Sequence, residues 1–145
     1  MIKESFNRID PFENPELADY TNHFCLLCVT AFDLTEDVEW LELAEHLYSK
    51  YAGEYITDAI VFINQLQIKL RREGVISEED SKLLFTIKQK NTENLEMQFC
   101  TSVLLGCALE SKILFGQFES DNQERYKEFP IYKLYEHLCI SIGAV

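Results

Sequence analysis

The chain contains very few residues that end helices or form turns, and this scarcity limits what it can fold into. Its 145 residues include only five glycines and three prolines, so the elements are expected to be long and the turns few. No Asn-Gly or Asp-Gly dipeptide is present to form a two-residue hairpin, and no pair of segments has the pattern of paired strands. We therefore expect an all-α fold: a single domain over residues 1–145, built as an array or bundle of about six to seven helices, with residues 1–13 as an N-terminal extension.

Capping residues predict where these helices begin and end. Asn14 precedes Pro15, which is typical of a first helical position, and Gly74 is expected to end a helix in a left-handed conformation. Ser77 and Asp80 resemble a capping box. The same signals predict helices from residue 15 to 33, from a Thr35 cap to Gly53, from there to residue 72, from Ser77 onward, from about residue 92 to 116, from a Ser120 cap onward, and from Pro130 to 140.

Two of the predicted helices have distinctive apolar patterns. The third carries Ile63 on one stripe and has Val61 and Ile68 on nearly the opposite side, which indicates packing between two neighbours. The helix near 92–116 is apolar almost all round and is therefore expected to be central. Gly106 within it would let another helix approach closely.

A Cys-x-x-Cys pair, Cys25 and Cys28, stands beside His23. A structural zinc site needs four Cys or His ligands, and a thioredoxin-like redox pair follows a strand. Because the neighbouring residues are apolar and the segment is expected to be helical, we interpret both cysteines as buried core residues. A small metal site that uses Cys25, Cys28 and His23 is the alternative. Five cysteines without an apolar leader indicate a reducing compartment, and the expected location is the cytoplasm.

The acidic composition restricts the partners. The chain has 25 acidic and 13 basic residues and a formal net charge of −12. Such a charge repels nucleic-acid phosphates and anionic lipid, so we expect neither nucleic-acid nor membrane binding. It favours a basic protein partner, because opposite fields speed encounter.

The sequence lacks the common catalytic motifs. Neither a His-Glu-x-x-His zinc site, a phosphate-binding glycine loop nor a Gly-x-Ser-x-Gly elbow is present. None of the three histidines follows a glutamate by three residues, as di-iron helical bundles require. We therefore expect a protein without enzymatic activity and without a cofactor.

The densest acidic segment covers residues 35–45, and its acids have no lysine or arginine four residues on to pair with. Leu43 is expected on the outward face among them, where an apolar side chain ringed by acids is a plausible contact for a basic surface. The alternative is a solvated helix face. The predicted partner-binding residues are Glu36, Asp37, Glu39, Glu42, Leu43, Glu45, His46, Glu54, Asp58, Glu78, Glu79 and Asp80.

In these respects the chain resembles the immunity proteins of bacterial toxin systems, including colicin-type and contact-dependent growth-inhibition systems. The likeness is carried by the acidic run Glu36–Glu45 and the cluster Glu78–Asp80, in a small helical chain without a catalytic motif. It is a likeness of type and not of motif. The resemblance implies a cytoplasmic inhibitor that binds a toxin domain, often a basic nuclease, and covers its substrate-binding cleft with acidic side chains.

Two other interpretations stay open. A helical adaptor that binds a peptide or a partner helix is indicated by a spacing like the first half of a tetratricopeptide repeat. A homodimer is the second interpretation, because tyrosines near the C-terminus are amphipathic enough for an interface, although such tyrosines are more often partly buried packing residues. The residues with the repeat-like spacing are Trp40, Leu43, Ala44 and Leu47, and the tyrosines are Tyr126, Tyr132 and Tyr135.

Overall fold

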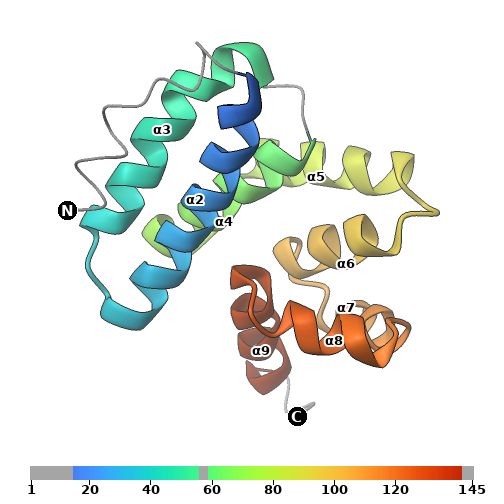
Figure 1. The fold of residues 1–145 in the computed structure, drawn as a ribbon. Coiled ribbons are helices and arrows are strands. Elements are labelled where there is room, and N and C mark those ends of the chain that lie inside the picture. The colour runs from blue at the N-terminus through green and yellow to red at the C-terminus, as the bar shows by residue number, and fades with distance from the viewer. Residues whose placement is uncertain (1–14, 56–58, 142–145) are drawn as a thin grey trace. The chain divides into compact units, whose positions relative to one another are not determined.

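The computed structural model describes residues 15–55 and 59–141, and these residues form eight helices and no strand (Figure 1). The all-α prediction is confirmed, with slightly more helices than expected. The predicted N-terminal extension, residues 1–13, lies outside the described residues. The helices are α2 (Pro15–Thr35), α3 (Glu39–Tyr55), α4 (Ala59–Glu73), α5 (Glu78–Lys90), α6 (Leu95–Leu104), α7 (Ala108–Gly116), α8 (Ser120–Tyr126) and α9 (Pro130–Ser141).

The chain divides into two compact units, with the boundary between Arg72 and Glu73. The first unit contains α2 and α3 and all of α4 except its last residue, and the second contains α5 to α9. The organisation of the chain as one domain stays a prediction.

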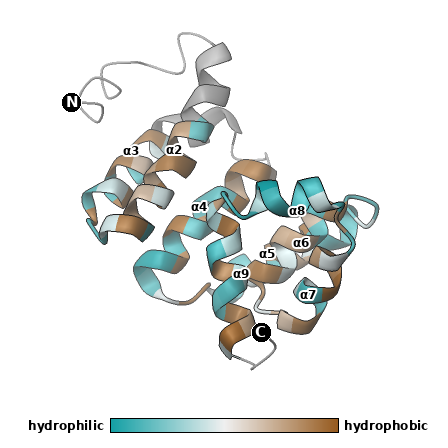
Figure 2. Cartoon of the chain, turned by 60° about the horizontal axis from the view of Figure 1, so that its bottom comes forward, coloured by the Kyte–Doolittle hydropathy of each residue, from teal (hydrophilic) through white to brown (hydrophobic). Residues whose placement is uncertain are grey.

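The first unit is built on α2 and α3, which lie side by side (Figures 1 and 2). They are the most extensively packed pair among the described helices, so the hairpin of α3 with α4 that the repeat-like spacing predicts is not the main contact. Their shared core also receives Val61 and Ile68 from α4, as the two-sided pattern of that helix predicts. Burial of each large aliphatic side chain contributes about 1.5–3 kcal/mol. The core residues are Cys25, Cys28, Val29, Leu41, Leu43, Ala44, Leu47, Tyr48, Val61 and Ile68.

A row of buried polar side chains joins α2 to α4. The Asn22 carboxamide oxygen accepts hydrogen bonds from the Tyr48 hydroxyl at 2.6 Å and from Asn64 at 2.9 Å. Gln67 donates to Asn64 at 3.2 Å, and its own carboxamide oxygen has no protein partner. These bonds fix the angular position of α4, because a rotation of that helix would leave buried polar groups unsatisfied.

The row ends at a bidentate ion pair between Arg71 and Asp33. The Arg71 Nε and Nη2 atoms donate to the two carboxylate oxygens of Asp33 at 2.7 and 2.8 Å. The Arg71 side chain is only 5% exposed. A buried pair of this geometry contributes orientation more than net stability, so it fixes the end of α4 against α2.

Aromatic rings fill the second unit. Phe99 of α6 lies at the centre, with the Tyr135 ring centroid at 5.3 Å and the Phe118 centroid at 5.5 Å. Tyr126 stacks on Phe118 at 4.9 Å. Tyr126 and Tyr135 are buried, and Tyr132 contacts Phe115. Tyr126 and Tyr135 therefore serve packing inside their own unit, whereas Tyr132 is half-buried. A homodimer stays a prediction.

The predicted central helix near 92–116 is two helices. α6 ends at Leu104 and α7 begins at Ala108, with Gly106 between them at a φ of 77°. A methyl group added at Gly106 would meet nothing within 4 Å, so the glycine does not serve a close helix contact as predicted. It provides the left-handed conformation that reverses the chain after α6.

Other predicted boundaries have mixed outcomes. Gly74 has a φ of 79°, and the Ser77 side chain accepts a hydrogen bond from the Asp80 amide, so both predictions are confirmed. α3 continues past Gly53 to Tyr55, so that glycine does not end it. The cap of α8 is Glu119 and not Ser120, because the helix begins one residue earlier than predicted.

Candidate functional site

The corner between α2 and α3, residues 34–39, contains most of the exposed acids that sequence analysis selected in the first unit. Glu36 ends α2 with a φ of 59°, and its amide donates to the Phe32 carbonyl at 2.7 Å. The Asp37 carboxylate accepts from the Glu39 amide at 2.9 Å and thus caps α3. Thr35, the predicted cap, is the last residue of α2. This turn projects the corner away from the core.

Two large aliphatic side chains are exposed among these acids. Leu34 is 81% exposed and Val38 is 43% exposed, and Glu36, Asp37 and Glu39 are exposed as well. Carboxylates around an exposed aliphatic side chain are suited to a surface that offers both an apolar depression and positive charge. We refer to residues 34–39 as the corner.

Leu43, the apolar anchor predicted from the sequence, is not on the surface. It is only 6% exposed and belongs to the core shared by α2, α3 and α4. The prediction was wrong because α3 packs against two helices, so its buried face is wider than a single stripe. Leu34 and Val38 take the place that the sequence analysis gave to Leu43.

Glu42 and Glu45 have a basic partner that their own helix does not supply. Arg72 of α4 donates from Nε to Glu45 at 2.8 Å, and its Nη2 atom lies 3.9 Å from Glu42. The hydrogen bond to Glu45 raises the pKa of Arg72. The prediction of uncompensated acids therefore fails at these two positions, because the compensation comes from a residue 27 positions away in the sequence.

The other predicted residues lie outside residues 34–39 of the sequence. His46 is exposed on α3, and the side chains of Glu54 and Asp58 lie outside the described residues. Glu78, Glu79 and Asp80 form the first turn of α5 in the second unit. Glu78 pairs with Lys82 on its own helix at 3.6 Å, and both side chains are exposed, so this pair contributes little to stability.

No family model, curated protein or solved structure matches the chain. Among the described helices, none combines the length and apolar character needed to cross a membrane.

The cysteine pair fills the core, as predicted. Cys25 and Cys28 are buried, and the Sγ atom of Cys25 lies 3.8 Å from the carbonyl oxygen of Ala44. Burial raises the pKa of the Cys25 thiol far above its ordinary value. His23 is exposed, so it points away from the two thiols. Within residues 15–55 and 59–141, no three His, Cys, Asp or Glu side chains are grouped as metal ligands.

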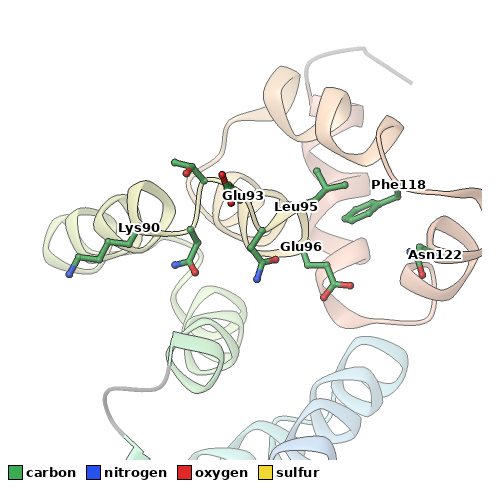
Figure 3. A pocket seen from close by; sticks show the side chains of 9 residues that line it. Lys90, Glu93, Leu95, Glu96, Phe118 and Asn122 are labelled. Atoms are coloured by element: carbon green, nitrogen blue, oxygen red, sulfur yellow. The ribbon is translucent and has the colours of Figure 1, made fainter.

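A shallow polar hollow of about 700 Å³ lies beside the turn between α5 and α6 (Figure 3). Leu95 and Phe118 point toward each other at one end, whereas Lys90 points away from them. The charged residues that line the hollow are one lysine and two glutamates, Lys90, Glu93 and Glu96.

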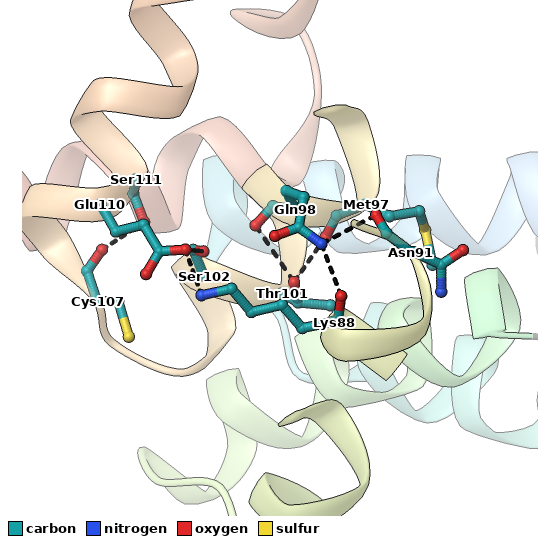
Figure 4. Close-up of polar contacts among 9 residues, drawn as sticks. All are labelled: Lys88, Asn91, Met97, Gln98, Thr101, Ser102, Cys107, Glu110 and Ser111. Carbon is teal, nitrogen blue, oxygen red and sulfur yellow. Dashed lines mark hydrogen bonds and ion pairs between the residues drawn. The ribbon is translucent and has the colours of Figure 1, made fainter. Parts of the chain in front are cut away.

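The sequence analysis missed a polar cluster in the second unit (Figure 4). Lys88 pairs with Glu110, which also accepts a hydrogen bond from the Ser102 hydroxyl at 3.1 Å. The hydrogen bond from Lys88 lowers the pKa of Glu110. Ser102 has no exposed surface, so a substrate cannot reach its hydroxyl. The cluster therefore joins α5, α6 and α7.

Proposed function

We propose that this protein is a cytoplasmic protein-binding inhibitor of the immunity-protein type, and that its corner binds a basic surface of a cognate toxin. The observation that carries the proposal is the exposure of Leu34 and Val38 among Glu36, Asp37 and Glu39. The net charge of −12 supports it, because a strongly acidic chain is steered toward a basic partner. The corner would inhibit by covering the positive residues with which a nuclease-type toxin holds its substrate.

The two kinds of side chain have different roles in this proposal. The carboxylates of Glu36 and Glu39 would accelerate association, and added salt would slow it by screening. Leu34 would enter an apolar depression on the partner and slow dissociation, as buried apolar anchors do at interface centres. Glu42 and Glu45 contribute less charge, because Arg72 already pairs with them.

The test begins with capture of a partner. The protein is immobilised, exposed to lysate of its native host together with the product of the adjacent upstream gene, and eluted with a salt ramp. We expect one basic protein, bound in a one-to-one ratio and resistant to moderate salt. Many weak partners that are lost at low salt would contradict the proposal.

A charge-reversed variant then tests the corner. We expect Glu36→Lys/Glu39→Lys to slow association with the captured partner by about tenfold or more at low salt. The matched control is Glu78→Lys/Glu79→Lys, which makes the same change in net charge at exposed positions in the second unit. Equal slowing by both variants would show that only the overall field matters, and the corner would not be the interface.

A further inference from the structure

α7 exposes two large aliphatic side chains on one face. Leu109 is 68% exposed and Ile113 is 64% exposed, and residues four apart on a helix are neighbours on its surface. Ala108 and Ser111 of the same helix are buried, and α7 packs on α6 and α9. Leu109 and Ile113 thus form an aliphatic ridge on the side of α7 away from its own unit.

A hollow lies directly beside this ridge. It has a volume of about 500 Å³ and is lined by residues 106–110, at the break between α6 and α7. Gly106 contributes no side chain there, and a methyl group in its place would meet nothing within 4 Å. Leu109 belongs to both features, so ridge and hollow share one surface.

The segment that forms this surface carries no net charge, in a strongly acidic chain. From Met97 to Phe118 the only charged residues are Glu110 and Lys112, and their charges cancel. Figure 2 shows the contrast between the brown segments of α6 and α7 and the teal of α8. The acidic remainder of the chain repels a second copy, and this repulsion is weakest at the surface of α7. A basic partner gains no attraction here, so the charge pattern favours a second copy over the partner of the corner.

We propose that α7 forms a twofold interface with a second copy of this chain, in which the ridge of each copy enters the hollow of the other. A twofold interface requires a surface that is complementary to itself, and a ridge beside a hollow on one face meets this requirement. The surface differs from the corner, so the proposal does not depend on the proposed function. Because α7 has only nine residues, we expect a small interface and a reversible dimer.

The test measures the mass of the full chain in solution over a range of concentrations, by sedimentation equilibrium. We expect the mass to rise from the 17.0 kDa of one chain toward twice that value. Leu109→Glu/Ile113→Glu should remain monomeric throughout. Leu109→Ala/Ile113→Ala should raise the dissociation constant by about tenfold or more. Circular dichroism checks that each variant keeps its helices, as expected for changes at exposed positions.

The matched control is Leu83→Glu/Phe85→Glu, which places two glutamates at exposed apolar positions of α5 in the same unit. It should dimerise much as the wild type does, apart from the small effect of its added charge. A wild-type chain that stays monomeric at every concentration would overturn the proposal. Dimers that persist in Leu109→Glu/Ile113→Glu, or are lost equally in the control, would also overturn it. Added salt should strengthen association, because it screens the like charges of the two copies.

Discussion

Glu36 combines an unfavourable backbone conformation with an exposed charge. Its φ of 59° lies in the left-handed region, which is costly for a residue with a Cβ atom. We expect Glu36→Gly to raise the free energy of unfolding by about 1 kcal/mol, because glycine adopts this conformation without the steric cost. Chemical denaturation measures the change.

The comparison variant is Glu36→Ala, which removes the same charge and keeps the Cβ atom. It should not gain this stability. If both variants gain the same stability over the wild type, the gain comes from the loss of negative charge and not from removing the steric cost of the positive φ. Under the proposed function, both variants should slow association with the basic partner, so Glu36→Gly would separate stability from association.

Glu110 makes stability depend on pH in a defined direction. Lys88 lowers the pKa of this carboxyl below its ordinary 4.5, so the ionised form is favoured by folding. Its contribution is present above pH 4.5 and is lost as the pH falls through the lower pKa of the folded state. We expect the difference in unfolding free energy between wild type and Glu110→Gln to shrink on acidification below pH 4.5. A difference that stays constant with pH would contradict this assignment.

At this scale the sequence predicted part of the candidate site. The acids of the corner are exposed as expected, and Cys25 and Cys28 are buried as expected. The sequence could not predict Arg72 as a partner of Glu45, because the contact joins separate helices. The error at Leu43 has the same origin, since the periodicity of one helix does not tell how many neighbours it packs against.

At the scale of the elements, the helix break at Gly106 depends on backbone conformation alone. We expect Gly106→Ala to lower the free energy of unfolding by about 1 kcal/mol, because its φ is 77° while the space around it is open. Gly116→Ala is the matched control. Gly116 is helical, has no positive φ and is equally uncrowded, so alanine should stabilise it by about 0.5–1 kcal/mol. Thermal unfolding of both variants checks that the two changes in the free energy of unfolding have opposite signs.

The sequence predicted the helix end at Gly74 and the cap at Ser77, and it missed the end near Gly106. Charged residues precede Gly74 and follow Ser77, and they indicate a turn. Gly106 lies between Leu105 and Cys107 in an apolar run, so nothing around it signals a stop. The structure places no side-chain cap on α7, which explains why one continuous helix was the natural prediction.

At the scale of the whole molecule, the two units offer a test of cooperativity. Asp33→Ala removes the carboxylate that pairs bidentately with the buried Arg71 guanidinium group, and we expect a loss of about 3 kcal/mol in the first unit. Hydrogen exchange of the full chain should then show faster exchange in α2 and α3 and little change in α6 and α9. Equal acceleration in all four helices would show that the chain unfolds as one domain, as the sequence analysis predicted.

The helical class followed from local signals, but the arrangement of the helices did not. The scarcity of glycine and proline and the capping residues are properties of short segments, so they predict elements. The contact between α2 and α3 and the ring cluster around Phe99 join residues far apart in the sequence. The sequence therefore left both an interface and a core position open for Tyr126 and Tyr135, with core packing the more frequent of the two.

The position of Arg71 has a consequence for how the chain is made. Arg71 is the last residue in the sequence that belongs to the row of polar side chains joining α2 to α4. The boundary between the two units follows directly after Arg72. A chain that leaves the ribosome from its N-terminus exposes every member of that row before any of the second unit emerges. The first unit can therefore assemble while the apolar segment from 97 to 118 is still being translated. That segment, which is nearly free of charge, therefore emerges when the first unit can already be folded.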